Sequence, residues 1–127
     1  HRPLFYQWLA FLNNTLQVEL MVRYYPHRHT NDEATIPNIV AAQDDRISDA
    51  LSIINDQLEH NEYLLGDTLT ACDYFLFMLA GWSLPIEKSP LTFKHLAAYL
   101  KRLCSNPTIE AVCNIEGIDL APFKSYS

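Results

Sequence analysis

The sequence has little glycine and few positive charges, and each shortage argues against a class of protein. Three glycines in 127 residues are too few for the tight turns of an all-β fold. Nine basic residues against 15 acidic ones give a net charge of −6, and no segment gathers Lys and Arg, which argues against a nucleic-acid surface. The longest apolar run, Tyr74–Trp82, is far below the roughly 20 residues that cross a bilayer, so we expect no membrane span.

Cysteine content and length set further bounds. Cys72, Cys104 and Cys113 are odd in number and form no CxxC pair, which indicates free thiols in a reducing, cytoplasmic location. No signal-peptide pattern opens the chain. With 49% hydrophobic residues, the chain can build one domain with its own core, which we place at 1–127.

Apolar residues recur at helical spacing along most of the chain, and no useful stretch alternates as a strand does. The spacing predicts helices at about 3–24, 35–60, 70–84 and 92–104, then a short helix from Pro107 that ends at Gly117. Residues 74–84 are apolar nearly all round, so this helix should be buried among the others. The predicted fold class is therefore all-α, a helical bundle around a central helix at about 70–84.

The remaining segments also have predicted environments. The second helix has an apolar stripe that should face the core, formed by Ile47, Ala50, Leu51, Ile54 and Leu58. The charged segment between Gln43 and Arg46 is expected to face solvent. Residues 120–127 are predicted to form a tail after the last helix.

Thr70 and Asp73 have the spacing of a capping box at the start of the central helix. The Thr70 hydroxyl can accept the Asp73 backbone N–H, and the Asp73 carboxylate can accept the Thr70 N–H. Leu69 and Tyr74 occupy the positions of a hydrophobic staple. Asp73 could instead act as an acid or base, but a pair that satisfies two otherwise unpaired amides favours a structural cap.

The segment Glu62–Asp73 resembles the cap of the central helix in the C-terminal domain of cytosolic glutathione S-transferases, with the bacterial beta-type members most similar. Asn106–Ile109 and Glu116–Ile118 are similar to the closing segment of that domain. Trp8, Leu9 and the order of helix lengths also fit, so the resemblance covers nearly the whole chain. It implies the all-α fold of this C-terminal domain.

Members of this family carry an N-terminal thioredoxin-like domain that binds most of the glutathione and holds the Ser, Tyr or Cys that acts on its thiol. No βαβ pattern precedes His1 in this sequence, so we expect no catalytic residue in the chain. The resemblance implies a domain for hydrophobic-substrate binding and homodimer formation. Its implied partners are the thioredoxin-like domain, a second copy and a small hydrophobic electrophile, with glutathione as co-substrate.

The resemblance also points to substrate-binding residues on two helices. Asn14 and Gln17 correspond to positions that contact glutathione in beta-type enzymes, although the local pattern alone favours a solvated face. Trp82 corresponds to an aromatic residue near the electrophile pocket, although it could instead belong to the core. Met21 and Tyr24 are expected to form the opposite wall.

Four positions depart from the family pattern or have two interpretations. Beta-type members often have His followed by Lys where this chain has Gln17 and Val18, and Ala10 replaces a polar contact residue. These differences remove polar or cationic groups that would face an anionic ligand. Gly81 costs about 1 kcal/mol relative to Ala inside a helix, and it either permits close helix approach or leaves space beside the pocket.

Metal and thiol chemistry have weak support in the sequence. His27 and His29 lie two residues apart in a loop with no third ligand, so we predict no metal site. Cys72 lies in the first turn of the central helix, which lowers a thiol pKa, but burial opposes this effect. We expect all three cysteines to be inert core thiols.

Two functions from different classes follow. The first is the hydrophobic-substrate and dimerisation domain of a glutathione S-transferase-like protein, in which the glutathione thiol attacks a bound electrophile. The isolated chain should then be inactive. The alternative is a non-catalytic protein–protein interaction module of the same fold, as in elongation factor gamma subunits, which the residues at Ala10, Gln17 and Val18 would suit.

Overall fold

The computed structural model describes residues 2–124, most of which are helical. The elements run in the order α1 (Arg2–Phe11), a π-helical segment η1 (Leu12–Gln17), α2 (Val18–Tyr24), the 3₁₀ turns η2 (Pro26–His29) and η3 (Glu33–Thr35), α3 (Ile36–Leu58), α4 (Ala71–Trp82), the 3₁₀ turn η4 (Pro90–Thr92), α5 (Lys94–Cys104), α6 (Pro107–Glu116) and α7 (Ala121–Lys124). No β-strand occurs among these described residues, so the predicted all-α class is confirmed.

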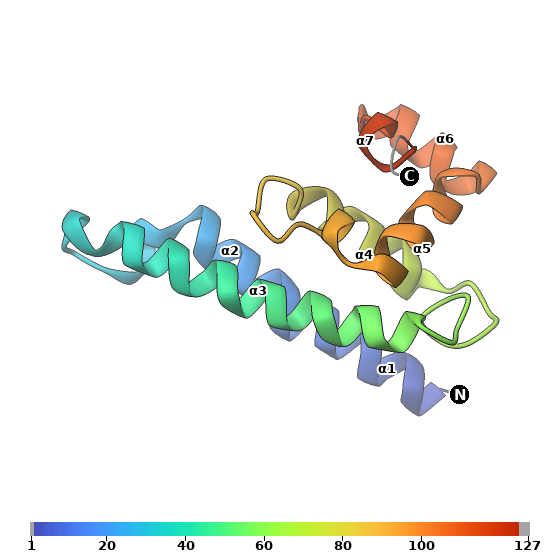
Figure 1. Ribbon diagram of the computed structural model, residues 1–127, viewed down its shortest axis with the longest axis horizontal. Coiled ribbons are helices and arrows are strands. Elements are labelled where there is room, and N and C mark those ends of the chain that lie inside the picture. The colour runs from blue at the N-terminus through green and yellow to red at the C-terminus, as the bar shows by residue number, and fades with distance from the viewer. Residues whose placement is uncertain (1, 125–127) are drawn as a thin grey trace.

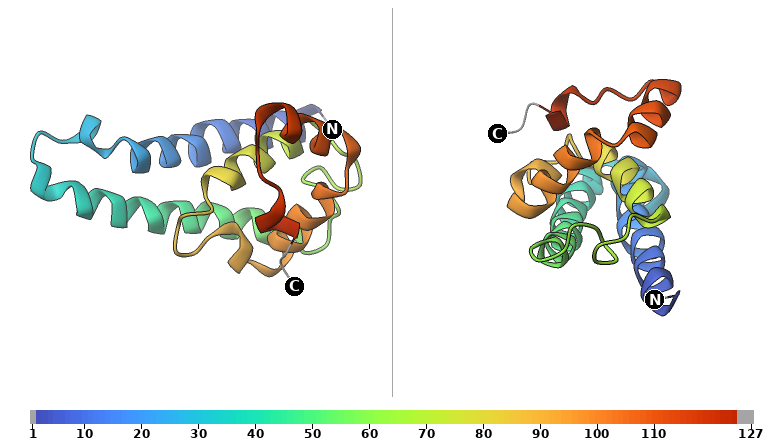
Figure 2. Two further views of the ribbon diagram at one scale, coloured as in Figure 1. Left: turned by 90° about the horizontal axis from the view of Figure 1, so that it is seen from above. Right: turned by 90° about the vertical axis from the view of Figure 1, so that its right-hand side faces the viewer.

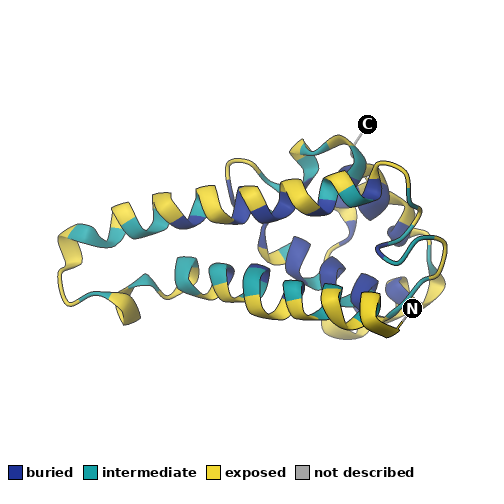
Figure 3. Cartoon of the chain, turned by 90° about the horizontal axis from the view of Figure 1, so that it is seen from below, coloured by how far each residue is buried: buried dark blue, intermediate teal, exposed yellow. Residues whose placement is uncertain are grey.

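The helices form a long hairpin with the other elements packed at one end. Figure 1 shows α1, η1 and α2 as one rod that runs antiparallel to α3. The connection between α2 and α3 makes the far tip, whereas α4 to α7 gather at the end that holds the N-terminus (Figure 2). Buried residues concentrate at this second end, and the hairpin arm is largely half-buried or exposed (Figure 3).

The first helix changes its winding because its apolar residues repeat every four positions, at Leu4, Trp8, Leu12, Leu16 and Leu20. Four residues turn an ideal α-helix about 40° beyond one full turn, so the stripe would drift steadily around the rod. A π segment holds more residues per turn, because its hydrogen bonds span five residues, and this reduces the drift. Leu12, Leu16 and Leu20 are all fully buried as a result.

Helix α3 confirms one expectation and corrects another. Its predicted apolar stripe is buried along the core. The solvated face expected between Gln43 and Arg46 was wrong in part, because Asp45 and Arg46 are exposed but Gln43 is buried. The Gln43 amide donates to the backbone oxygen of Glu19 at 3.0 Å and to its carboxylate at 2.6 Å. Arg23 pairs with Asp44 at 2.5 Å. Polar side chains therefore join α2 and α3 along the arm of the hairpin.

Helix α5 takes its N-terminal cap from another helix. Its own N-cap residue, Phe93, makes no side-chain cap bond. The side-chain oxygen of Asn55 in α3 instead accepts the backbone N–H groups of His95 and Leu96 at 2.8 and 2.9 Å. These bonds satisfy donors that a helix start leaves unpaired and fix α5 against α3.

The C-terminal segment combines a predicted stop with a correction. Gly117 ends α6 with φ of 71°, and the Ile118 N–H donates to the Cys113 carbonyl at 2.8 Å, as a Schellman motif requires. The tail expected at 120–127 was wrong in part, because α7 forms there and Phe123 is fully buried, with its ring centroid 4.9 Å from that of Phe77. Residues 125–127 lie outside the described residues.

Candidate functional site

The ends of α2 and α4 border a hollow of about 220 Å³, lined by Met21, Tyr24, Tyr25 and Trp82. The Tyr24 hydroxyl donates to the backbone carbonyl of Trp82 and joins the two helix ends. All four side chains are about 40% exposed, so aromatic and apolar surface faces this opening. The structure thus brings three residues of the predicted substrate wall, Met21, Tyr24 and Trp82, to one place.

Gly81 leaves space next to Trp82. A methyl group built at Gly81 would have no neighbouring heavy atom within 4 Å, so the glycine does not serve close helix packing. It lines a second hollow of about 310 Å³, together with Met78, Trp82 and Phe123. Of the two interpretations of this glycine, the structure therefore supports open space beside the aromatic side chain.

A third and larger hollow, of about 600 Å³, lies between α4 and α6. Tyr74, Met78 and Trp82 line it from α4, and Ile109 and Val112 line it from α6. The composition of the central helix predicted burial on all sides. This was wrong in part, because one face of α4 opens on this groove. Trp82 borders all three hollows and is the residue that they share.

Asn14 and Gln17 lie one to two turns before Met21, on the π-helical segment. Asn14 is exposed and Gln17 is half-buried, and neither is among the residues that line the hollow at Trp82. Their side-chain amides can both donate and accept hydrogen bonds, and π segments recur at functional sites. Their role as glutathione contacts stays a prediction, as does the role of the three wall residues.

Asp73 is fully buried at the start of α4 and accepts three hydrogen bonds. The donors are the backbone N–H of Thr70 at 2.8 Å, the backbone N–H of Leu64 at 3.2 Å and the hydroxyl of Tyr99 at 2.6 Å. The predicted capping box is present. Because both carboxylate oxygens are occupied by donors of the protein itself, Asp73 is built to hold structure and not to move a proton to a ligand.

This network also acts on the titration of Tyr99. Burial raises the pKa of Tyr99 well above its usual value, and the nearby charge and hydrogen bond of Asp73 raise it further. Sequence reasoning missed Leu64 and Tyr99 as partners of Asp73. Periodicity within single helices carries no signal for contacts between residues 9 and 26 positions apart.

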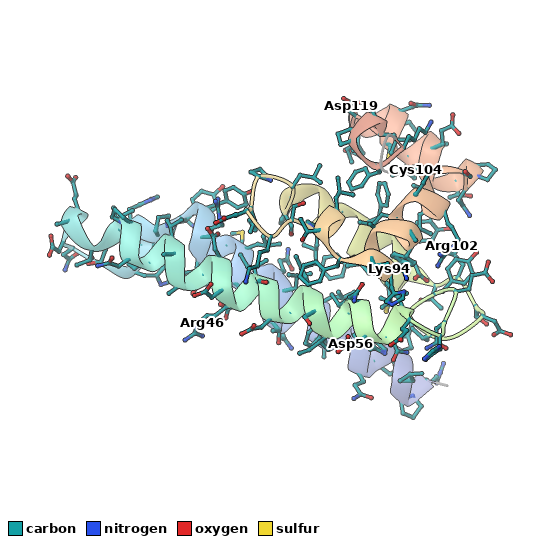
Figure 4. The ribbon with its side chains drawn as sticks, viewed as in Figure 1. Arg46, Asp56, Lys94, Arg102, Cys104 and Asp119 are labelled. Atoms are coloured by element: carbon teal, nitrogen blue, oxygen red, sulfur yellow. The ribbon has the colours of Figure 1, made fainter. Side chains whose placement is uncertain are left out.

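The three cysteines are free and buried, and burial raises the pKa of each thiol. The Cys72 thiol donates to the Phe5 carbonyl at 3.6 Å, and Cys104 lies where α5 ends (Figure 4). Thiols of this kind stay protonated near neutral pH and are poor nucleophiles. Within residues 2–124, no group of three or more His, Cys, Asp or Glu side chains is placed to hold a metal ion.

Two arginines adjoin the tyrosines of the hollow, and sequence reasoning missed both. The guanidinium carbon of Arg28 lies 4.3 Å from the ring centroid of Tyr25, and that of Arg23 lies 5.4 Å from the ring centroid of Tyr24. The sequence feature that could have indicated the position of Arg28 is the helix end at Pro26. Pro26 starts a 3₁₀ turn in which the Arg28 N–H donates to the Tyr25 carbonyl at 3.1 Å. This turn folds Arg28 back onto the ring.

Comparisons with known proteins agree with this architecture. The sequence model of the family "Glutathione S-transferase, C-terminal domain" matches residues 16–107. Glutathione S-transferase GstA of Escherichia coli O157:H7 is 23% identical over 113 residues, which cover 88% of this chain and 52% of that protein. The chain thus spans about half the length of this curated relative. No solved structure gave a significant match. Among the described helices, none is long and apolar enough to cross a membrane.

Proposed function

The chain belongs to the glutathione S-transferase family through its C-terminal domain, and from this premise we propose that it forms the hydrophobic-substrate wall of a glutathione-conjugating protein. The observation that carries the proposal is the hollow in which Trp82 meets Met21 and Tyr24. A concave, mostly apolar site with aromatic walls suits a small hydrophobic electrophile. In the parent reaction the glutathione thiolate attacks that electrophile and forms a thioether.

In this proposal the chain binds and orients the electrophile but does not activate the thiol. The lining of the hollow is apolar apart from two tyrosine hydroxyls, and the hydroxyl of Tyr24 is already bonded to the Trp82 carbonyl. Thiol activation is assigned to a thioredoxin-like domain, with glutathione as co-substrate and contacts from Asn14 and Gln17. The contribution of this chain is then positioning, which brings the reacting atoms together.

The partners and location follow from exposed surface and from the thiols. The apolar groove between α4 and α6 suits cover by the thioredoxin-like domain, because soluble proteins seldom leave large apolar patches uncovered. A homodimer is also part of the proposal, because a second copy of the chain could cover exposed apolar surface in the same way. Three free, buried cysteines suit a reducing compartment such as the cytoplasm.

Replacing Trp82 tests the substrate wall. In the full-length protein, Trp82→Ala should raise KM for a chlorodinitrobenzene about tenfold, since about 1.4 kcal/mol of apolar contact is lost. KM for glutathione should stay within twofold. The variant keeps the bond from Tyr24, because that bond uses the backbone oxygen of residue 82.

Ile53→Ala is the matched control, since Ile53 is an apolar side chain of α3 that is half exposed and lines none of the hollows described above. It should leave both KM values unchanged. An electrophile KM that is insensitive to Trp82→Ala would contradict the substrate wall. Conjugation by residues 1–127 alone would contradict the assignment of thiol activation to another domain.

A non-catalytic interaction module is the second candidate, and the surface of the first helix favours it. Ala10 and Val18 are exposed at positions where polar contact residues were expected from the family pattern. In this case the full-length protein should conjugate no aromatic halide. Its native gene product should also migrate on a denaturing gel near the 14.6 kDa of this chain, without a further domain.

A further inference from the structure

We propose that the hollow of Met21, Tyr24, Tyr25 and Trp82 selects flat aromatic ligands that carry a negative charge, and that Arg28 pairs with this charge. The inference rests on the proposed function, because it names the class of electrophile that the same pocket wall accepts. It concerns the specificity for the ligand, and it assigns a role to Arg28, which lies in the 3₁₀ turn η2 near the hairpin tip.

The size and walls of the hollow determine the shape of the ligand. Its volume of about 220 Å³ is below the roughly 300–1,000 Å³ of pockets that hold a whole drug-sized molecule. One aromatic ring system therefore fits, with its substituents directed outward. Two tyrosines and a tryptophan offer faces and edges for ring packing, and the flexible thioether of Met21 can adapt to a flat ring.

Arg28 does not line the hollow itself, but it places a positive charge against one of its walls. Its guanidinium group stacks on the ring of Tyr25, which itself lines the hollow. A stacked guanidinium keeps its N–H edges available for a carboxylate or sulfonate, which it can bind through two hydrogen bonds. Within residues 2–124, no acidic side chain forms an ion pair with Arg28, whereas Arg23 is paired with Asp44 of α3.

The same arrangement disfavours a cationic ligand. Aromatic cages bind cations through ring faces, but the ring of Tyr25 already contacts Arg28, and Arg23 lies over the ring of Tyr24. A second cation would meet the charge of Arg28 at Tyr25, whereas at Tyr24 the ring face is occupied by Arg23, whose charge Asp44 balances. Because the chain as a whole has a net charge of −6, attraction of an anion depends on this local group and not on the overall field.

A pair of fluorescent ligands with one aromatic skeleton tests the inference. Anilinonaphthalene sulfonate and its uncharged parent, phenylnaphthylamine, are titrated into the full-length protein and its variants. Arg28→Gln should weaken binding of the sulfonate about threefold to fivefold, as expected for an exposed ion pair, and leave binding of the uncharged parent within twofold. The difference should shrink at 1 M salt, where such pairs are screened.

Two variants locate the effect. Arg46→Gln removes an exposed arginine of α3 that pairs with Glu19 at 3.7 Å and does not line the hollow, and it should leave both affinities unchanged (Figure 4). Trp82→Ala should weaken both ligands, because it removes a wall that they share. The inference is overturned if Arg28→Gln weakens both ligands equally or neither, or if Arg46→Gln matches its effect on the sulfonate.

These titrations need no thiol chemistry, so they stand apart from the test of the proposed function. If the protein conjugates glutathione, a chloronitrobenzoate should lose kcat/KM in Arg28→Gln about threefold to fivefold, whereas an uncharged chloronitrobenzene should not. If conjugation is absent while binding of the sulfonate still depends on Arg28, the proposed function fails and the charge selectivity stands. If conjugation is present without that dependence, the selectivity fails alone.

Discussion

Removing the Asp73 carboxylate should destabilise the fold strongly without altering the hollow at Trp82. Asp73→Ala deletes the acceptor shared by the Thr70 N–H, the Leu64 N–H and the Tyr99 hydroxyl. The carboxylate is fully buried, so water cannot replace it without local opening. Trp82 lies nine residues further along α4, about 14 Å away at 1.5 Å per residue.

The magnitude follows from the three donors. A buried donor left without an acceptor costs about 1–3 kcal/mol, and loss of a helix cap costs about 1 kcal/mol. Because the Thr70 N–H is only half-buried, a total of about 4 kcal/mol is expected. This is a large share of the 5–15 kcal/mol by which domains are stable. At about 4 °C per kcal/mol for this size, the melting temperature should fall by about 15 °C.

Thermal melts followed by circular dichroism measure this loss, and Tyr99→Phe provides the internal comparison. Tyr99→Phe removes one of the three donors and should cost about 1–1.5 kcal/mol. The double variant should be less destabilised than the sum of the two single variants, because the hydroxyl stranded in Asp73→Ala no longer exists. Strict additivity, or a melting temperature unchanged in Asp73→Ala, would refute the network. Ligand affinity of the folded protein should stay unchanged.

Two further predictions concern glycine and alkaline pH. Gly81→Ala should stabilise the protein by up to about 1 kcal/mol, because the added methyl group meets no neighbour. Gly117→Ala should destabilise it by about 1 kcal/mol, because φ is 71° at this residue. Urea unfolding of both variants measures the two changes. The raised pKa of Tyr99 means that the stability conferred by its neutral phenol is fully present below about pH 10, the pKa of an unfolded tyrosine, and is lost as pH rises toward the folded pKa. Melting temperatures of Tyr99→Phe should therefore fall less steeply above about pH 10 than those of the unmodified protein, and parallel curves would contradict this.

Local patterns predicted the elements of this fold well, because each pattern is read within one segment. The buried stripe of α3, the capping box at Thr70 and the stop at Gly117 all depend on spacings of a few residues. The four-residue repeat of the first helix also contained the signal for its π segment, since it does not match the 3.6-residue period. Phe123 escaped prediction because a single turn is too short to show a period.

Contacts between elements were not predictable in this way. Whether Asn55 reaches the start of α5, Gln43 reaches Glu19 or Tyr99 reaches Asp73 depends on the rotation and crossing of two helices. The periodicity of one helix fixes its buried face but not the partner that this face meets. The same limit applies to Arg28, whose position over Tyr25 follows from a turn between helices.

Helix α4 shows why a site and a core have the same composition. Leu76, Leu79 and Ala80 are buried among the helices, whereas Tyr74, Met78 and Trp82 line open hollows, and both groups are apolar. Hydropathy indicates only that burying an apolar surface is favourable. It does not indicate whether a helix, a second domain or a ligand covers that surface. The difference lies in the neighbours: small side chains and helix ends, such as Gly81 and the end of α2, leave the space beside Trp82 open. When a helix has more apolar surface than the rest of its chain covers, the uncovered part is therefore the place to look for both a ligand and a partner.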